Sequence, residues 1–169
     1  MHTRIENVLQ VTPEVFWKHL FFDADFNRDL YRELGFEAYE VQALETLPDG
    51  RVRRVLRAEP PLNAPSMIKS RLKGRVFYTE EGIYDPVRGV WEFANESSVA
   101  SDSTRVSGSI RAEPHPEGML HVVELDIEVK AFGLGAVVER VIEKNTRDSY
   151  RVSTEFVNRY ARERGLSSQ

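Results

Sequence analysis

A stretch near the C-terminus places two polar residues in the middle of an apolar helix face. The face is made of residues three and four positions apart, namely Val138, Val141, Ile142, Asn145, Ser149, Val152 and Phe156. This spacing puts all of them on one side of an α-helix. A buried amide without a partner costs about 1–3 kcal/mol. Asn145 and Ser149 therefore bond to the sheet or to a trapped water, line a cavity that holds solvent or a polar ligand group, or lie half exposed.

The residues before this helix, Gly133-Leu134-Gly135, fit the first two glycines of a dinucleotide-binding turn. That turn requires a third glycine, where this chain has Val138, and it requires a strand after the helix, where none is predicted. We interpret the glycines as a sharp turn from a strand into the helix, and we predict no cofactor.

The residue types that commonly bind metals or act in catalysis form no recognisable site in this sequence. His121 and Glu124 are three apart on a predicted strand and therefore point to opposite faces, so they cannot share a metal ion. The chain has no cysteine, no G-x-S-x-G turn and no P-loop. We predict no metal site and assign no catalytic residue. His19, His121 and Glu80 are the candidates to test if an interior cavity supports an enzyme reaction.

A basic segment over residues 65–75 stands out in a protein of net charge −4. Its cations are Lys69, Arg71, Lys73 and Arg75, and its apolar residues are Met67, Ile68 and Leu72. One interpretation is a mobile flap that touches an anionic membrane surface or an acidic ligand head through Lys69, Arg71 and Lys73. The alternative is a solvated loop whose apolar residues cover the sheet edge.

Composition narrows the class of protein. The 169 residues suggest one domain, over residues 1–164, followed by a disordered tail over 165–169. The hydrophobic share of 41% and the charged share of 30% are those of a soluble globular protein. The negative net charge gives no case for nucleic acid binding. The absence of cysteine, of a signal peptide and of an apolar run of about 20 residues leads us to expect a cytoplasmic protein.

Periodicity and turn residues predict an α+β order of elements. Thr12-Pro13-Glu14 begins a short helix in which Val15, Phe16, His19 and Leu20 face inward, and Asp23 or Asp25 caps a second helix that Gly35 ends. Pro48-Asp49-Gly50 joins a hairpin. The predicted strands cover residues 4–11, 36–47, 51–58, 75–84, 90–97, 104–113 and 119–130. A short helix lies within 60–74, and a long helix runs over 134–164.

The last strand has the clearest pattern. Met119, His121, Val123, Leu125, Ile127 and Val129 alternate with a mostly polar set, so one face points inward and the other toward solvent. Short turns between the strands favour an antiparallel meander. The long helix must bury its apolar face against this sheet. Whether side chains fill the space between the helix and the sheet is the question on which the function depends.

The order of elements, the stretch Val11-Thr12-Pro13-Glu14-Val15-Phe16 and the long C-terminal helix resemble the START-like, or SRPBCC, superfamily. More narrowly, the chain is similar to an uncharacterised bacterial START-like group. The marks of that group are Ala64-Pro65-Ser66-Met67 before Gly74, a strand that ends in Val106-Ser107-Gly108, and the turn from Phe132 to Glu139. The resemblance implies a helix-grip fold, in which a curved antiparallel sheet of about seven strands wraps around the C-terminal helix and encloses a hydrophobic cavity.

From the resemblance and the helix face we predict a soluble binding or transfer protein for a lipid, sterol, isoprenoid or polyketide-like molecule. The expected ligand contacts are Tyr39, Phe77, Trp91, Phe93, Val138, Val141, Ile142, Asn145, Ser149 and Val152. The expected entrance is framed by Met67, Ile68, Leu72, Phe132 and Leu134. One alternative is a polyketide cyclase or hydratase-like enzyme. Another is an interaction module with a filled interior that contacts a protein through residues 159–164 or the basic segment.

Overall fold

The protein is described by a computed structural model that covers residues 1–169 except 62, 71–74, 100–101, 131–132, 134 and 169. Seven strands form one antiparallel sheet in the order β1-β7-β6-β5-β4-β3-β2. The strands are β1 (His2–Leu9), β2 (Ala38–Thr46), β3 (Val52–Glu59), β4 (Tyr78–Asp85), β5 (Val90–Ser97), β6 (Thr104–His115) and β7 (Gly118–Val129). The helices are α1 (Pro13–Val15), a π-helical segment η1 (Phe16–Phe21), α2 (Ala24–Glu33), α3 (Ser66–Lys69) and α4 (Gly135–Glu163).

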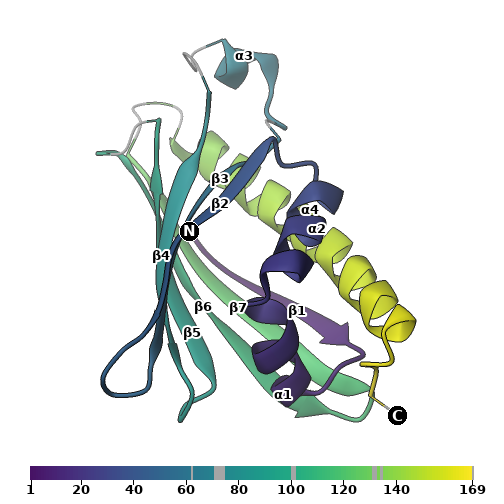
Figure 1. The fold of residues 1–169 in the computed structure, drawn as a ribbon. Coiled ribbons are helices and arrows are strands. Elements are labelled where there is room, and N and C mark those ends of the chain that lie inside the picture. The colour runs from purple at the N-terminus through teal and green to yellow at the C-terminus, as the bar shows by residue number, and fades with distance from the viewer. Residues whose placement is uncertain (62, 71–74, 100–101, 131–132, 134, 169) are drawn as a thin grey trace.

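The sheet curves around α4, which crosses it diagonally and contacts β1 and β7 (Figure 1). The side chain of Thr3 in β1 donates a hydrogen bond to Glu143 of α4 at 2.9 Å. Helices η1 and α2 lie along the open side of the sheet and contact each other, and α2 also contacts α4 (Figure 1). This arrangement is the helix-grip fold that the sequence predicted.

Local sequence signals explain where the helices begin and end. The Thr12 side chain accepts a hydrogen bond from the Val15 amide at 3.3 Å at the start of α1. Asp23 caps α2 by accepting from the Phe26 amide at 2.7 Å. Such caps satisfy amides that have no partner within the helix. Gly35 follows α2 with a φ of 73°, a left-handed conformation that glycine adopts without steric cost.

The predicted alternation of the last strand is confirmed in β7. Met119, His121, Val123, Leu125 and Ile127 are all buried. Val122 is the exception, because it is only 1% exposed although it belongs to the opposite face. Its register partners on that face are Glu6 of β1 and Arg111 of β6.

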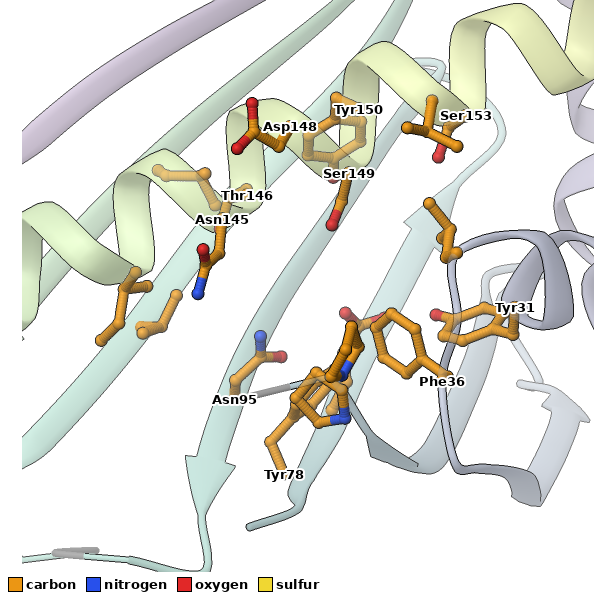
Figure 2. A pocket seen from close by; sticks show the side chains of 18 of the residues that line it. Tyr31, Phe36, Tyr78, Asn95, Asn145, Thr146, Asp148, Ser149, Tyr150 and Ser153 are labelled. Atoms are coloured by element: carbon orange, nitrogen blue, oxygen red, sulfur yellow. The ribbon is translucent and has the colours of Figure 1, made fainter. Parts of the chain in front are cut away.

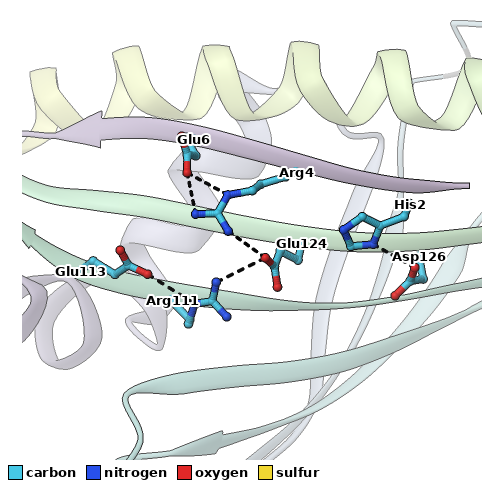
Figure 3. A network of polar contacts seen from close by, with 7 residues as sticks. All are labelled: His2, Arg4, Glu6, Arg111, Glu113, Glu124 and Asp126. Atoms are coloured by element: carbon cyan, nitrogen blue, oxygen red, sulfur yellow. Dashed lines mark hydrogen bonds and ion pairs between the residues drawn. The ribbon is translucent and has the colours of Figure 1, made fainter.

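Charged pairs cover this outer face of β1, β7 and β6 (Figure 3). Arg4 lies opposite Glu124 and contacts it at 2.9 Å, and Arg111 reaches the same carboxylate at 3.4 Å. His2 and Asp126 form a second cross-strand pair at 3.0 Å. Exposed pairs of this kind contribute about 0–1 kcal/mol each, so they identify the solvent face rather than hold the fold.

The first helical segment differs from the prediction. The sequence pattern placed His19 inward, but His19 is exposed, whereas Phe16, Trp17 and Leu20 are buried. The cause is the π-helical geometry of η1, whose i to i+5 hydrogen bonds change which residues share a face.

The Val106-Ser107-Gly108 stretch lies inside β6, as the predicted strand over residues 104–113 has it, and not at the end of a strand, as the resemblance implied. Gly108 faces Phe93 of β5 and Leu125 of β7 in the sheet register. A Cβ atom at Gly108 would lie 2.3 Å from the Glu124 carbonyl oxygen and 3.1 Å from the Phe93 ring. Glycine is therefore required by close packing within the strand.

Leu166 and Ser168 pack against the fold, although the sequence predicted a disordered tail over residues 165–169. Leu166 is partly buried against the hydrophobic core. The Ser168 amide donates to the Gln10 carbonyl at 3.0 Å, and its hydroxyl donates to the Glu117 carbonyl at 2.8 Å. Local composition could not reveal this, because the partners lie far away in the sequence.

Candidate functional site

A cavity of about 860 Å³ lies between the inner face of the sheet and α4. Phe16, Phe21 and Phe26 line it from the first helices, and Leu125 lines it from β7. Pro60, Pro61 and Ile68 line it from the segment between β3 and β4. The volume falls within the range of about 300–1,000 Å³ that is typical of small-molecule sites.

The helix face predicted from the sequence borders this cavity. Of its seven members Phe156 does not line the cavity, and the six that were expected to contact the ligand do: Val138, Val141, Ile142, Asn145, Ser149 and Val152. Phe77 and Phe93 line it from the side of the sheet. Figure 2 shows Asn145 and Ser149 on α4 pointing toward side chains on the sheet.

Trp91 and Tyr39, which were expected to contact the ligand, are not among the residues that line the cavity. Trp91 is fully buried beneath Phe21 and Phe22, whose rings lie 5.3 and 5.9 Å from its own. Tyr39 stacks on Tyr31 at 4.0 Å between ring centroids. Both rings therefore support cavity residues from behind, because α2 and η1 cover the parts of the sheet that carry them.

Only part of the predicted entrance falls within the described residues. Ile68 lines the cavity, whereas Met67 is 50% exposed and does not. Leu72, Phe132 and Leu134 lie outside the described residues, as do two of the three cations of the predicted membrane contact, Arg71 and Lys73. Lys69 ends α3. The membrane contact stays a prediction.

Asn145 and Ser149, the polar pair on α4, both line the cavity, which is one of the three interpretations of these residues given above. Asn145 also donates from Nδ2 to the Asn63 carbonyl oxygen at 3.0 Å. This bond joins α4 to the segment that precedes α3. Ser149 lines the cavity one helical turn farther along. The pair therefore combines a cavity position with a structural bond to the rim.

A buried ion pair in the cavity wall was not recognised as a unit from the sequence. Arg54 of β3 and Glu80 of β4 both line the cavity and contact each other at 3.2 Å, with side chains 6% and 13% exposed. Arg54 also donates to the Phe21 carbonyl oxygen at 2.9 Å. Its guanidinium lies 4.5 Å from the Phe21 ring centroid and 4.9 Å from that of Trp91. Arg54 thereby fixes the end of η1 to the sheet.

Three tyrosines line the same cavity: Tyr31 of α2, Tyr78 of β4 and Tyr150 of α4. Burial raises the pKa of each hydroxyl, and the negative charge of Glu80 raises it further. Burial likewise raises the pKa of Glu80, although Arg54 opposes this shift. The tyrosines are therefore neutral hydrogen-bonding groups at physiological pH.

His121 of β7 lines the cavity between the rings of Phe16 and Tyr150, each 5.4 Å away. Burial lowers the pKa of its imidazole to about 4, so the ring is neutral at pH 7. Of the three residues named for a possible enzyme reaction, His121 and Glu80 reach the cavity and His19 does not.

Asn95 of β5 faces the cavity directly across from Glu80 in the sheet register. Its side-chain oxygen is buried and accepts no hydrogen bond from the described residues. Within that same part of the chain, no three His, Cys, Asp or Glu side chains group together as metal ligands. There is also no helix with the length and apolarity needed to cross a membrane in these ranges.

The comparisons with known proteins agree with this geometry. Solved structures of similar backbone include TTHA0849 from Thermus thermophilus, with a TM-score of 0.65 and 19% identity over 94% of this chain and 95% of that one. The Zhui aromatase/cyclase from Streptomyces sp. R1128 has a TM-score of 0.65 and 18% identity, covering 95% of both chains. Ara h 8.0201 has a TM-score of 0.64 and 12% identity over 93% of this chain and 97% of that one.

These likenesses show a shared fold, and they confirm the helix-grip fold that the resemblance implied. No protein of curated function matches the sequence. Residues 7–161 match the family described as "Protein of unknown function (DUF2505)". Because that match covers most of the chain, this protein belongs to the DUF2505 family.

Proposed function

We propose that this protein binds an apolar small molecule in the cavity between the sheet and α4. The observation that carries the proposal is the cavity of about 860 Å³, whose lining is predominantly apolar because aliphatic and aromatic side chains from the sheet and the first helices join the valines and Ile142 of α4. Each methylene buried there contributes about 0.8 kcal/mol, so a chain of about ten carbons offsets much of the cost of association. A carrier or a transfer protein for a lipid, isoprenoid or polyketide-like molecule fits this site.

The hollow interior argues against the interaction module, which required a filled one. The helix end that such a module would use is also engaged within the chain. Arg159 contacts Glu33 at 2.8 Å, and Arg162 donates to Gln10 at 3.0 Å. Arg164 lies 3.5 Å from the centroid of the Tyr160 ring.

The test is binding of a neutral apolar dye, N-phenyl-1-naphthylamine, to the wild type and to two variants of neighbouring valines. Val138→Trp places a large ring at a position that lines the cavity. Val137→Trp places the same ring at a position that is 38% exposed and does not line it. We expect dye fluorescence with the wild type and with Val137→Trp, and at least about tenfold weaker binding with Val138→Trp. Equal binding by the two variants would contradict an interior site.

A second candidate is an enzyme of the polyketide cyclase or hydratase kind. The specific observation in its favour is that two of the candidate residues named from the sequence, His121 and Glu80, both line the cavity. The test is incubation with a poly-β-keto thioester, followed by chromatography of the products. Turnover that disappears in His121→Phe would establish the enzyme, and recovery of unchanged substrate would favour the carrier.

A further inference from the structure

One group of polar side chains that line the cavity lies on two neighbouring strands of the sheet, β4 and β5. Glu80 and Asn95 are direct cross-strand partners in the β4–β5 register. Directly opposed residues in an antiparallel pair have Cβ atoms about 4.5–5.5 Å apart, so their side chains act on the same region. Tyr78 lies two positions before Glu80 and therefore shares its face. Figure 2 shows Asn95 and Tyr78 on the sheet side of the cavity, opposite Asn145 and Ser149.

Within the described part of the chain, this region offers one hydrogen-bond acceptor that lacks a donor and a second, a carboxylate, that has a single one. The Asn95 side-chain oxygen accepts nothing from the described residues, although it is buried. Among those residues, the carboxylate of Glu80 has Arg54 as its one charged or hydrogen-bonding partner, at 3.2 Å. A buried acceptor without a donor is costly, and a ligand that supplies the donor removes that cost.

Arg54 does not turn this region into an anion site. Its two terminal nitrogens are used, one by the Phe21 carbonyl oxygen at 2.9 Å and one by Glu80. Its Nε has no hydrogen-bond partner among the described residues, but this atom is buried. The guanidinium is further covered by the rings of Phe21 and Trp91. A ligand carboxylate would have to displace Glu80 and then lie beside it in a site of low polarity.

The pKa shifts of the tyrosines and of His121 also disfavour charged groups in the cavity. Burial and the charge of Glu80 raise the pKa of the Tyr78 and Tyr150 hydroxyls, which disfavours a negative charge there. Burial lowers the pKa of His121 to about 4, which disfavours a positive charge. The tyrosine hydroxyls and the imidazole of His121 therefore stay in their neutral forms at pH 7.

We propose that the acceptor pair, Glu80 and Asn95, selects an uncharged apolar molecule that carries a hydroxyl group, and that it discriminates against the corresponding carboxylate. The hydroxyl donates its hydrogen to the Asn95 oxygen or to Glu80 and accepts one from a tyrosine hydroxyl such as that of Tyr78. The inference rests on the proposed function, since it names the ligand class of the same cavity.

The experiment measures displacement of N-phenyl-1-naphthylamine at pH 7.5 by three ligands of one chain length: decan-1-ol, decyl methyl ether and decanoate. We expect the alcohol to bind about tenfold more tightly than the ether, which lacks the donor, and at least tenfold more tightly than the carboxylate. An ether or a carboxylate that binds as tightly as the alcohol would overturn the inference. Failure of the dye itself to bind would instead overturn the proposed function.

Variants of Glu80 and Asn95 distinguish selectivity that comes from these two acceptors from selectivity that comes from the hydrophobicity of the ligand alone. Asn95→Leu should abolish the preference for alcohol over ether, and its fold should persist because the Asn95 oxygen bonds to no described residue. Glu80→Gln should narrow the gap between alcohol and decanoate. The matched control is Glu81→Gln, because Glu81 is 57% exposed and pairs with Arg53 instead of lining the cavity. Unchanged selectivity in both Asn95→Leu and Glu80→Gln would refute the role of the pair.

Discussion

The neutral buried state of His121 leads to a quantitative prediction about stability and pH. The imidazole is 6% exposed, and burial lowers its pKa from 6.5 to about 4 in the folded protein. Between these two values the unfolded chain binds a proton that the folded chain does not, so stability falls as the pH falls. The full shift corresponds to about 3 kcal/mol, and about 2 kcal/mol of this is lost between pH 7 and pH 5.

The assay is urea unfolding of the wild type and of His121→Phe at pH 7 and at pH 5. Phenylalanine keeps a flat ring between Phe16 and Tyr150 but cannot be protonated. We expect the free energy of unfolding of the wild type to fall by about 2 kcal/mol more than that of the variant over this interval. The comparison cancels the contribution of Glu80, which is common to both proteins.

His19→Gln is the matched control for this measurement, because His19 is exposed. It should keep the pH dependence of the wild type. An identical pH dependence in the wild type and in His121→Phe would refute the reasoning, because it would mean that His121 is protonated as readily in the folded protein as in the unfolded chain.

Three further predictions concern packing, charge and capping. Gly82→Ala should destabilise the protein by about 1–3 kcal/mol in thermal unfolding, because its Cβ atom would lie 2.1 Å from the fully buried ring of Trp91; unchanged stability would contradict this packing. Arg54→Met should lower the free energy of unfolding in urea by about 3–5 kcal/mol, because it leaves the buried Glu80 without its cation. Adding Glu80→Gln should restore part of this loss, and a double variant no more stable than Arg54→Met alone would contradict the pairing. Asp23→Ala should cost about 1 kcal/mol, because it removes the cap of α2, and an unchanged denaturation midpoint would contradict that role.

Features that depend on neighbours in the sequence could be predicted. Asp23 and Gly35 mark the ends of α2 by their own chemistry, and the alternation in β7 follows from the strand period. The cavity face of α4 followed from spacings of three and four, which bring Asn145 and Ser149 to the same side as their apolar neighbours.

Features that depend on the sheet register could not be predicted. Arg54, Glu80 and Asn95 come from three strands, and only the pairing of β3, β4 and β5 brings them together. The sequence identifies Glu80 only as one of three titratable candidates, and nothing in it points to Arg54 as the partner of Glu80. Trp91 reads as a ligand contact by its type, yet Gly82 on the adjacent strand leaves the space in which its ring is buried.

If the cavity holds an apolar molecule, native mass spectrometry of the protein purified from its own host should detect it. We expect one apolar adduct per chain, which organic extraction then identifies as an uncharged molecule with a hydroxyl group. A mass without any adduct, together with no uptake of N-phenyl-1-naphthylamine, would mean that the cavity is not a binding site for apolar molecules.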